Sequence, residues 1–262
     1  MKYRFAEDAK PQLKLLLIAT AITIALWFIP YAEYAVYPIR LFVTFIHESS
    51  HALVSLLTGG SVQSLTVSAN GEGAVWSASA NWFSFALTSS AGYLGTTFFG
   101  VLLLFLIRKA YSAKAVLYSL AGLIGVMTVL FAFVVPIINY LSGQVTLSSI
   151  AFTTITGALL TAGLYAIGRF GSLKVANFAV AFLAVQLVLN ALSDLKTLFF
   201  LNAPMIGSNI QTDAVNMQNA TGLPAIVWIF IWIGISVLMI SIGLRVYAVS
   251  QKNPNHDLPF ED

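Results

Sequence analysis

The chain contains no cysteine and very little charge. Without cysteine, neither a disulfide framework nor a thiolate metal site is possible, so His, Asp or Glu must hold any bound metal. Charged residues make up only 9% of the 262 residues, and hydrophobic residues make up 58%. A soluble domain has about 25% charged residues. These proportions predict a polytopic membrane protein.

Seven segments are apolar and long enough to cross a lipid bilayer as helices. They cover residues 13–30, 37–57, 86–107, 115–136, 148–168, 175–200 and 224–248. The predicted fold class is therefore an all-α polytopic membrane protein with six or seven transmembrane helices. Because no long linker or sustained repeat divides the chain, we expect one integral domain over residues 1–262, located in the plasma membrane.

The positive charges lie mostly at the ends of the predicted helices. The thirteen lysines and arginines give a net charge of +3 and form no continuous patch. Lipid headgroups explain such a distribution, so we expect the lipid bilayer, and no nucleic acid, as a partner. The orientation of the chain in the membrane stays open.

A short β-hairpin is predicted after the second apolar segment. Gly59 and Gly60 are typical of a helix end, and residues 61–68 are rich in β-branched side chains. Asn70-Gly71 is a hairpin-turn pair, after which residues 72–78 can return as a second strand. An extended substrate peptide could add to the edge of this hairpin, although an ordinary surface loop is an equal alternative.

Two of the three histidines flank a glutamate in the sequence His47-Glu48-Ser49-Ser50-His51. Residues four apart share one face of a helix, so both imidazoles can bind one Zn²⁺, with Glu48 beside the open position of the metal. This pattern also occurs by chance on ordinary helices. Here, however, three strongly polar side chains stand in an apolar segment, where metal binding would satisfy both imidazoles.

A zinc hydrolase needs a third protein ligand. The candidates outside the two ends of the chain are Glu33, Glu48, Glu72, Asp194 and Asp213, and the remaining histidine is His256 in the polar tail.

Asp194 is the strongest candidate, because an ionised carboxylate in an apolar span costs about 2.5–3.5 kcal/mol and needs a partner. Gln186, Asn190 and Asp194 also fall on one helix face. A plain interhelical hydrogen bond is the alternative for Asp194. We expect Asp213 to be a helix cap or loop residue and Glu72 to be a solvated turn residue.

Several of these segments together resemble the site-2 protease family of intramembrane zinc metallopeptidases, in its peptidase family M50B-like branch. The similarity is strongest over residues 40–100, and it rests on the histidine pair, Leu57-Thr58-Gly59-Gly60, Asn70-Gly71 and Ser90-Ala91-Gly92-Tyr93-Leu94-Gly95.

The resemblance implies that His47, His51 and Asp194 are zinc ligands, that Glu48 is the acid/base and that Asn190 lies near the substrate. The usual Leu-Asp-Gly of the family is replaced here by Leu192-Ser193-Asp194-Leu195.

The function that we expect is hydrolysis of peptide bonds in transmembrane or membrane-associated proteins, by a zinc-activated water with Glu48 as general base. One alternative is a non-proteolytic zinc-binding membrane protein, or a degenerate protease homologue. Another is a transporter whose Gln186, Asn190 and Asp194 line a permeation path. Against the transporter, matching halves of the chain contain no paired broken helices.

Overall fold

The computed structural model describes residues 9–143, 145–202 and 212–248. The helices run in the order α1 Lys10–Phe28, α2 Ala32–Leu57, α3 Trp82–Arg108, α4 Ala113–Met127, α5 Val135–Ile138, α6 Leu147–Phe170, α7 Leu173–Asn202, α8 Asp213–Thr221 and α9 Ala225–Ala248. Two strands, β1 Ser61–Val67 and β2 Gly73–Ala78, lie between α2 and α3. A π-helical segment, Thr128–Val134, joins α4 to α5.

The predicted fold class is confirmed. Helices occupy all seven predicted apolar segments, and the hairpin follows α2. Among the described residues, five helices are long and apolar enough to cross a membrane, namely Trp82–Arg108, Ala113–Ile138, Leu147–Phe170, Leu173–Phe200 and Ala225–Val246. The short helix α8 was not among the predicted helices.

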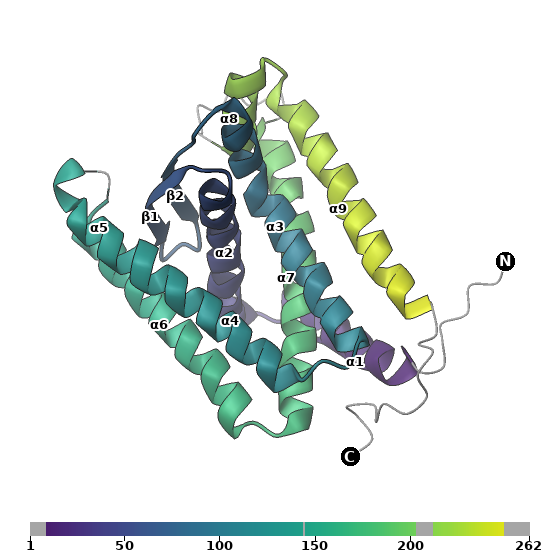
Figure 1. Ribbon diagram of the computed structural model, residues 1–262. Coiled ribbons are helices and arrows are strands. Elements are labelled where there is room, and N and C mark those ends of the chain that lie inside the picture. The colour runs from purple at the N-terminus through teal and green to yellow at the C-terminus, as the bar shows by residue number, and fades with distance from the viewer. Residues whose placement is uncertain (1–8, 144, 203–211, 249–262) are drawn as a thin grey trace.

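Helix α2 lies in the middle of the fold, with the hairpin on one side and α3 on the other (Figure 1). Its side chains Phe42, Phe45 and Ile46 are buried in the main hydrophobic core. Small residues of α3 allow the two helix backbones to come close together, as at Gly95, where an added Cβ would overlap the Ser50 side chain of α2. This close packing sets α3 beside the histidine-bearing face of α2.

The hairpin is antiparallel, with Ser61 opposite Ala78 and Val67 opposite Gly73. At its turn, Gly71 has a φ of +85°, a left-handed conformation that favours glycine. Two side chains of α2 hold this turn: the Tyr37 hydroxyl donates to the Ala69 carbonyl at 2.8 Å, and the Thr44 hydroxyl donates to the Gly71 carbonyl at 2.8 Å.

The outer edge of β1 is bound by helix α6. The backbone N–H of Val67 donates to the Thr153 hydroxyl oxygen at 2.9 Å, and that hydroxyl lies 3.1 Å from the Val67 carbonyl. Strand β2 differs, because its residues are exposed or half-buried along its whole length. The hairpin is therefore anchored through β1 and through its turn.

Helix α8 packs against α3 and α9 at the end of the bundle where the hairpin also ends (Figure 1). Its Ala214 and Met217 are buried in a second hydrophobic cluster, which includes Trp232 of α9. Two indole N–H groups hold its carboxyl-terminal end: Trp82 donates to the Ala220 carbonyl at 2.8 Å, and Trp228 donates to the Thr221 hydroxyl at 3.0 Å. These contacts fix the position of the first residue of α8, Asp213.

Candidate metal centre

His47 and His51 lie one turn apart on α2 and point the same way, as their spacing predicts. Their Nε2 atoms are 3.2 Å apart, and their rings meet edge to face with centroids 4.9 Å apart. His51 is buried and His47 is half-buried. The pair therefore presents two nitrogen atoms toward one point.

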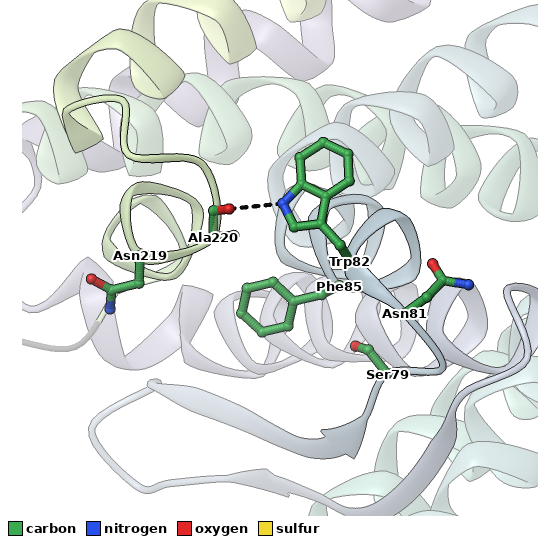
Figure 2. A pocket seen from close by; sticks show the side chains of 6 residues that line it. All are labelled: Ser79, Asn81, Trp82, Phe85, Asn219 and Ala220. Atoms are coloured by element: carbon green, nitrogen blue, oxygen red, sulfur yellow. Dashed lines mark hydrogen bonds between the residues drawn. The ribbon is translucent and has the colours of Figure 1, made fainter.

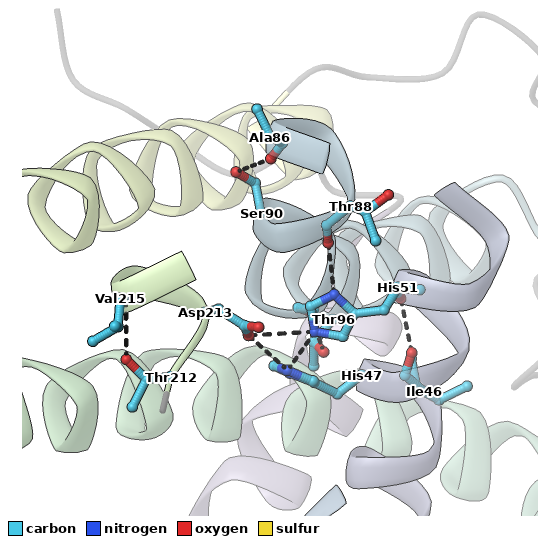
Figure 3. A network of polar contacts seen from close by, with 12 residues as sticks. Ile46, His47, His51, Ala86, Thr88, Ser90, Thr96, Thr212, Asp213 and Val215 are labelled. Atoms are coloured by element: carbon cyan, nitrogen blue, oxygen red, sulfur yellow. Dashed lines mark hydrogen bonds and ion pairs between the residues drawn. The ribbon is translucent and has the colours of Figure 1, made fainter. Parts of the chain in front are cut away.

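Asp213 brings a carboxylate to the same point (Figure 3). Its Oδ2 atom lies 3.6 Å from Nε2 of His47 and 3.3 Å from Nε2 of His51. Within the described ranges, His47, His51 and Asp213 are the group whose ligand atoms all lie within 4.8 Å of one another, as metal binding requires. Asp213 opens α8 directly after Thr212, whose hydroxyl accepts from the Val215 N–H and so caps the helix.

The charge state of Asp213 suits a metal ligand. Burial alone would raise the pKa of its carboxyl group, but the charges of His51 and His47 and their hydrogen bonds outweigh burial. The pKa of Asp213 is therefore held well below its ordinary value. The carboxylate is the form that binds metal ions.

The orientation of the His51 ring is set by α3. Its Nδ1 atom lies 2.6 Å from the backbone carbonyl oxygen of Thr88 (Figure 3). Because a carbonyl oxygen can only accept, Nδ1 carries a proton and donates it, so Nε2 is the ring nitrogen that faces His47 and Asp213 and that would bind a metal ion in place of its proton. A hydrogen bond of this kind on the second ring nitrogen is typical of metal-binding histidines.

Gly92 of α3 leaves open the space in front of the two ring nitrogens. A Cβ added at Gly92 would overlap the Nε2 atoms of both His47 and His51. The histidine pair therefore faces a bare stretch of helix backbone. Because Gly92 has no side chain, space for a bound ion remains beside the ring nitrogens of His47 and His51.

Glu48 stands beside this group and is only 5% exposed. It lies against the first residue of β2, since a Cβ at Gly73 would overlap its carboxylate. In the described part of the chain, no hydrogen bond engages that carboxylate, which interacts electrostatically with His47, His51 and Asp213. Glu48 thus lies between the three candidate ligands and the hairpin.

Asp194 does not join the three-residue group. Its side chain is exposed on α7, and it interacts with His47 electrostatically without placing an oxygen among the clustered ligand atoms. The described residues therefore bring Asp213, and not Asp194, to the two histidines, because α8 packs against α3 and carries Asp213 there.

Asn190 is half-buried on the same helix. Its amide N–H donates to the backbone and side-chain oxygens of Gln186, at 2.9 and 3.2 Å. Gln186 in turn donates to the Thr23 hydroxyl of α1 at 2.8 Å. Gln186 and Asn190, two of the three polar residues on this face of α7, therefore link α7 to α1.

A shallow pocket lies between the end of the hairpin, the start of α3 and the end of α8 (Figure 2). Its lining residues are Ser79, Asn81, Trp82, Phe85, Asn219 and Ala220. The hydrogen bond from Trp82 to the Ala220 carbonyl crosses it. The pocket does not include the metal-binding group, but it shares α8 with that group.

Comparison with known proteins supports the membrane peptidase interpretation. The model of the Peptidase M50B-like family matches residues 17–243, a region that includes the hairpin and all three residues of the candidate metal centre. No curated protein matches the chain. No solved structure matches it either. The match covers most of the chain, and together with the five apolar helices it makes this protein an integral membrane protein of the Peptidase M50B-like family.

Proposed function

We propose that the protein is an intramembrane zinc metalloprotease that cuts transmembrane or membrane-associated proteins at the plasma membrane. The observation that carries this proposal is the convergence of His47 Nε2, His51 Nε2 and Asp213 Oδ2 beside a buried Glu48. Membership of a peptidase family supports it.

The spacing of the three ligand atoms suits zinc. Two ligands at about 2.0–2.1 Å from a tetrahedral zinc ion lie about 3.3 Å from each other. The three separations among His47, His51 and Asp213 are 3.2, 3.3 and 3.6 Å. Two imidazoles and one carboxylate are also a ligand set of catalytic zinc sites, which keep their fourth position open.

In this proposal, Asp213 replaces Asp194 as the third ligand. Asp213 is held within ligand distance of both histidines by a helix that is docked through buried side chains. Asp194 remains a nearby negative charge, which interacts with His47 from the neighbouring helix α7.

Glu48 is the proposed general base. When bound, Zn²⁺ supplies Lewis acidity, which polarises the scissile carbonyl and lowers the pKa of a water molecule. The Glu48 carboxylate accepts a proton from the attacking water as the new C–O bond forms, and then passes this proton to the nitrogen of the leaving amine as the C–N bond breaks. Its position beside the metal ligands, with no competing hydrogen bond in the described residues, suits that role.

Strand β2 is the proposed docking edge for the substrate. Proteases bind extended backbone, and a transmembrane helix must unwind before its backbone can pair with a strand. Because Thr153 bonds the outer edge of β1, the edge that β2 offers is the one on which a peptide can add. Gly73, at the start of that strand, lies against Glu48, so a peptide on β2 would pass the general base.

Asn190 remains the proposed side-chain contact to the unwound substrate. Its amide N–H groups are engaged by Gln186, and among the described residues its side-chain oxygen has no donor. That oxygen can accept a hydrogen bond from a substrate N–H that has lost its helical partner.

Replacing Glu48 by Gln tests the proposed function. Proteoliposomes would contain the protein with a mixture of single-span membrane proteins, and mass spectrometry would detect new amino termini. We expect the Glu48→Gln variant to keep stoichiometric zinc and to lose about 10²–10⁴-fold in cleavage rate. The matched control is Glu72→Gln, at the exposed hairpin turn, which should cleave normally. Cleavage by Glu48→Gln at the wild-type rate, or a zinc-loaded wild type that never cleaves, would contradict the proposal.

A further inference from the structure

Tyr93 is held rigidly at the metal centre. It follows Gly92 on α3, and its ring meets the His47 ring edge to face, with centroids 4.7 Å apart and planes at 85°. Tyr93 also stacks with Trp232 of α9, at 5.4 Å between centroids. Trp232 is 1% exposed and belongs to the cluster that holds α8. The aromatic contacts from α2 and α9 therefore leave the tyrosine ring little freedom.

The Tyr93 side chain, packed on the His47 ring, stands within electrostatic range of the acids of the site. It interacts electrostatically with the carboxylates of Asp213, Asp194 and Glu48. Among the described residues, it makes no hydrogen bond with any of them. Tyr93 is half-buried, and its hydroxyl is a donor with no hydrogen bond among the described residues, so it can donate to a ligand that enters the site.

Hydrolysis of a peptide bond creates a need for such a donor. When water attacks the scissile carbon, the carbonyl oxygen gains negative charge, and a preorganised donor aimed at that oxygen lowers the barrier. In the proposed mechanism both histidines bind the metal and Glu48 accepts a proton. The backbone N–H groups of α2 and α3 beside the histidines lie inside these helices and are used by the helix hydrogen bonds, so neither helix offers a free backbone donor at that point.

We propose that the Tyr93 hydroxyl donates a hydrogen bond to the carbonyl oxygen of the scissile peptide as that oxygen gains charge. This inference rests on the proposed protease function and adds to it a second catalytic residue, which comes from α3. Tyr93 forms no covalent bond and keeps its proton. The adjacent Gly92 carries no side chain in front of the two histidine nitrogens, where a Cβ would overlap both.

The first test is the variant Tyr93→Phe, which keeps the ring and removes only the hydroxyl. We expect kcat to fall by about 10²–10³-fold, as for the loss of one oxyanion donor, with KM and zinc content unchanged. The matched control is Tyr118→Phe. Tyr118 lies on α4 and packs with Tyr165 of α6, away from the site, and its variant should keep full activity.

The second test does not depend on turnover. It uses a phosphinic analogue of a cleaved peptide, whose tetrahedral oxygen imitates the charged carbonyl oxygen. We expect Tyr93→Phe to bind this analogue more weakly by the factor lost in kcat, and to bind the uncleaved peptide as the wild type does. A merely structural role for Tyr93 would weaken both ligands alike.

The two proposals fail in different ways. If the wild type prefers the analogue and Tyr93→Phe binds it equally tightly, the inference about Tyr93 is wrong and the protease proposal stands. If the zinc-loaded wild type shows no preference for the analogue over the peptide, both proposals are wrong.

Discussion

Replacing Gly92 by alanine should remove metal binding and leave the fold intact. The added Cβ would overlap the Nε2 atoms of both His47 and His51. A zinc ion must come within about 2.0–2.1 Å of those same atoms. A methyl group and a metal ion cannot share this space, so the histidine rings must turn away.

The expected stability change of the Gly92→Ala protein is small. Alanine in place of glycine within a helix stabilises it by about 1 kcal/mol. Turning the His51 ring away breaks its hydrogen bond to the Thr88 carbonyl, which costs about 1 kcal/mol. The two effects have opposite signs and similar size, so the thermal midpoint of the metal-free protein should barely move.

The expected loss of zinc affinity is large. Removing a group that only orients a metal ligand lowers affinity by about 10–100-fold. Alanine at position 92 displaces two ligands at once, so we expect a loss of at least about 100-fold. Competition with a chromophoric chelator measures this affinity, and thermal unfolding in detergent measures stability.

Two glycine variants serve as controls for Gly92→Ala. Gly122→Ala makes the same exchange on α4, where an added Cβ meets nothing, and it should keep full zinc affinity. Gly95→Ala crowds Ser50 without reaching the histidine rings, so it should lower stability before it lowers zinc affinity. Zinc binding by Gly92→Ala within a few-fold of the wild type would refute the reasoning.

Three further predictions concern the supports of the site. Removing the metal with a chelator should speed amide exchange in α8 more than in α3, because Asp213 then loses its shared ion; equal changes in both helices would contradict this. Trp228→Phe removes the hydrogen bond to Thr221 and should lower the local stability of α8 by about 1 kcal/mol. Amide exchange in α8 should then be about fivefold faster, and an unchanged rate would show that this hydrogen bond does not hold α8. Thr153→Val leaves the buried Val67 N–H without its partner and should lower the free energy of unfolding by about 1–3 kcal/mol. Thermal unfolding measures this change, and wild-type stability would show that the Thr153–Val67 hydrogen bond does not anchor the hairpin.

The parts of the fold that local sequence determines were predictable. Long apolar stretches indicate membrane helices whatever their neighbours are, and the bounds of the helices follow those stretches. The hairpin was predictable from Asn70-Gly71, where the chain needs a glycine with positive φ. The histidine pair was predictable because residues four apart on a helix always share a face.

The approach of Asp213 to the histidines, which makes it the proposed third ligand, could not be predicted, because it depends on how distant segments pack. In the sequence, Asp194 stands out as a lone acid in an apolar span, whereas Asp213 was expected to be a helix cap or loop residue. Only the docking of α8, through Trp82, Trp228 and its buried apolar residues, brings Asp213 to the histidines. The presence of Asp213 among the few acids of the chain was the one available signal.

The positions of Gly92 and Tyr93 beside the histidines could not be predicted from the sequence for a similar reason. A run of small residues predicts close helix packing, but it does not tell which residue faces the metal ligands. In the structure, the α2–α3 contact turns Gly92 toward both histidines, and the adjacent Tyr93 packs on His47.

The most direct test of the central claim is the zinc content of three purified proteins, the wild type, Asp213→Asn and Asp194→Asn. Each exchange keeps the size of the side chain and removes its negative charge, so packing is preserved. The proposed centre predicts one zinc ion per chain in the wild type and in Asp194→Asn, and a loss of zinc in Asp213→Asn. Zinc retained by Asp213→Asn and lost from Asp194→Asn would contradict it.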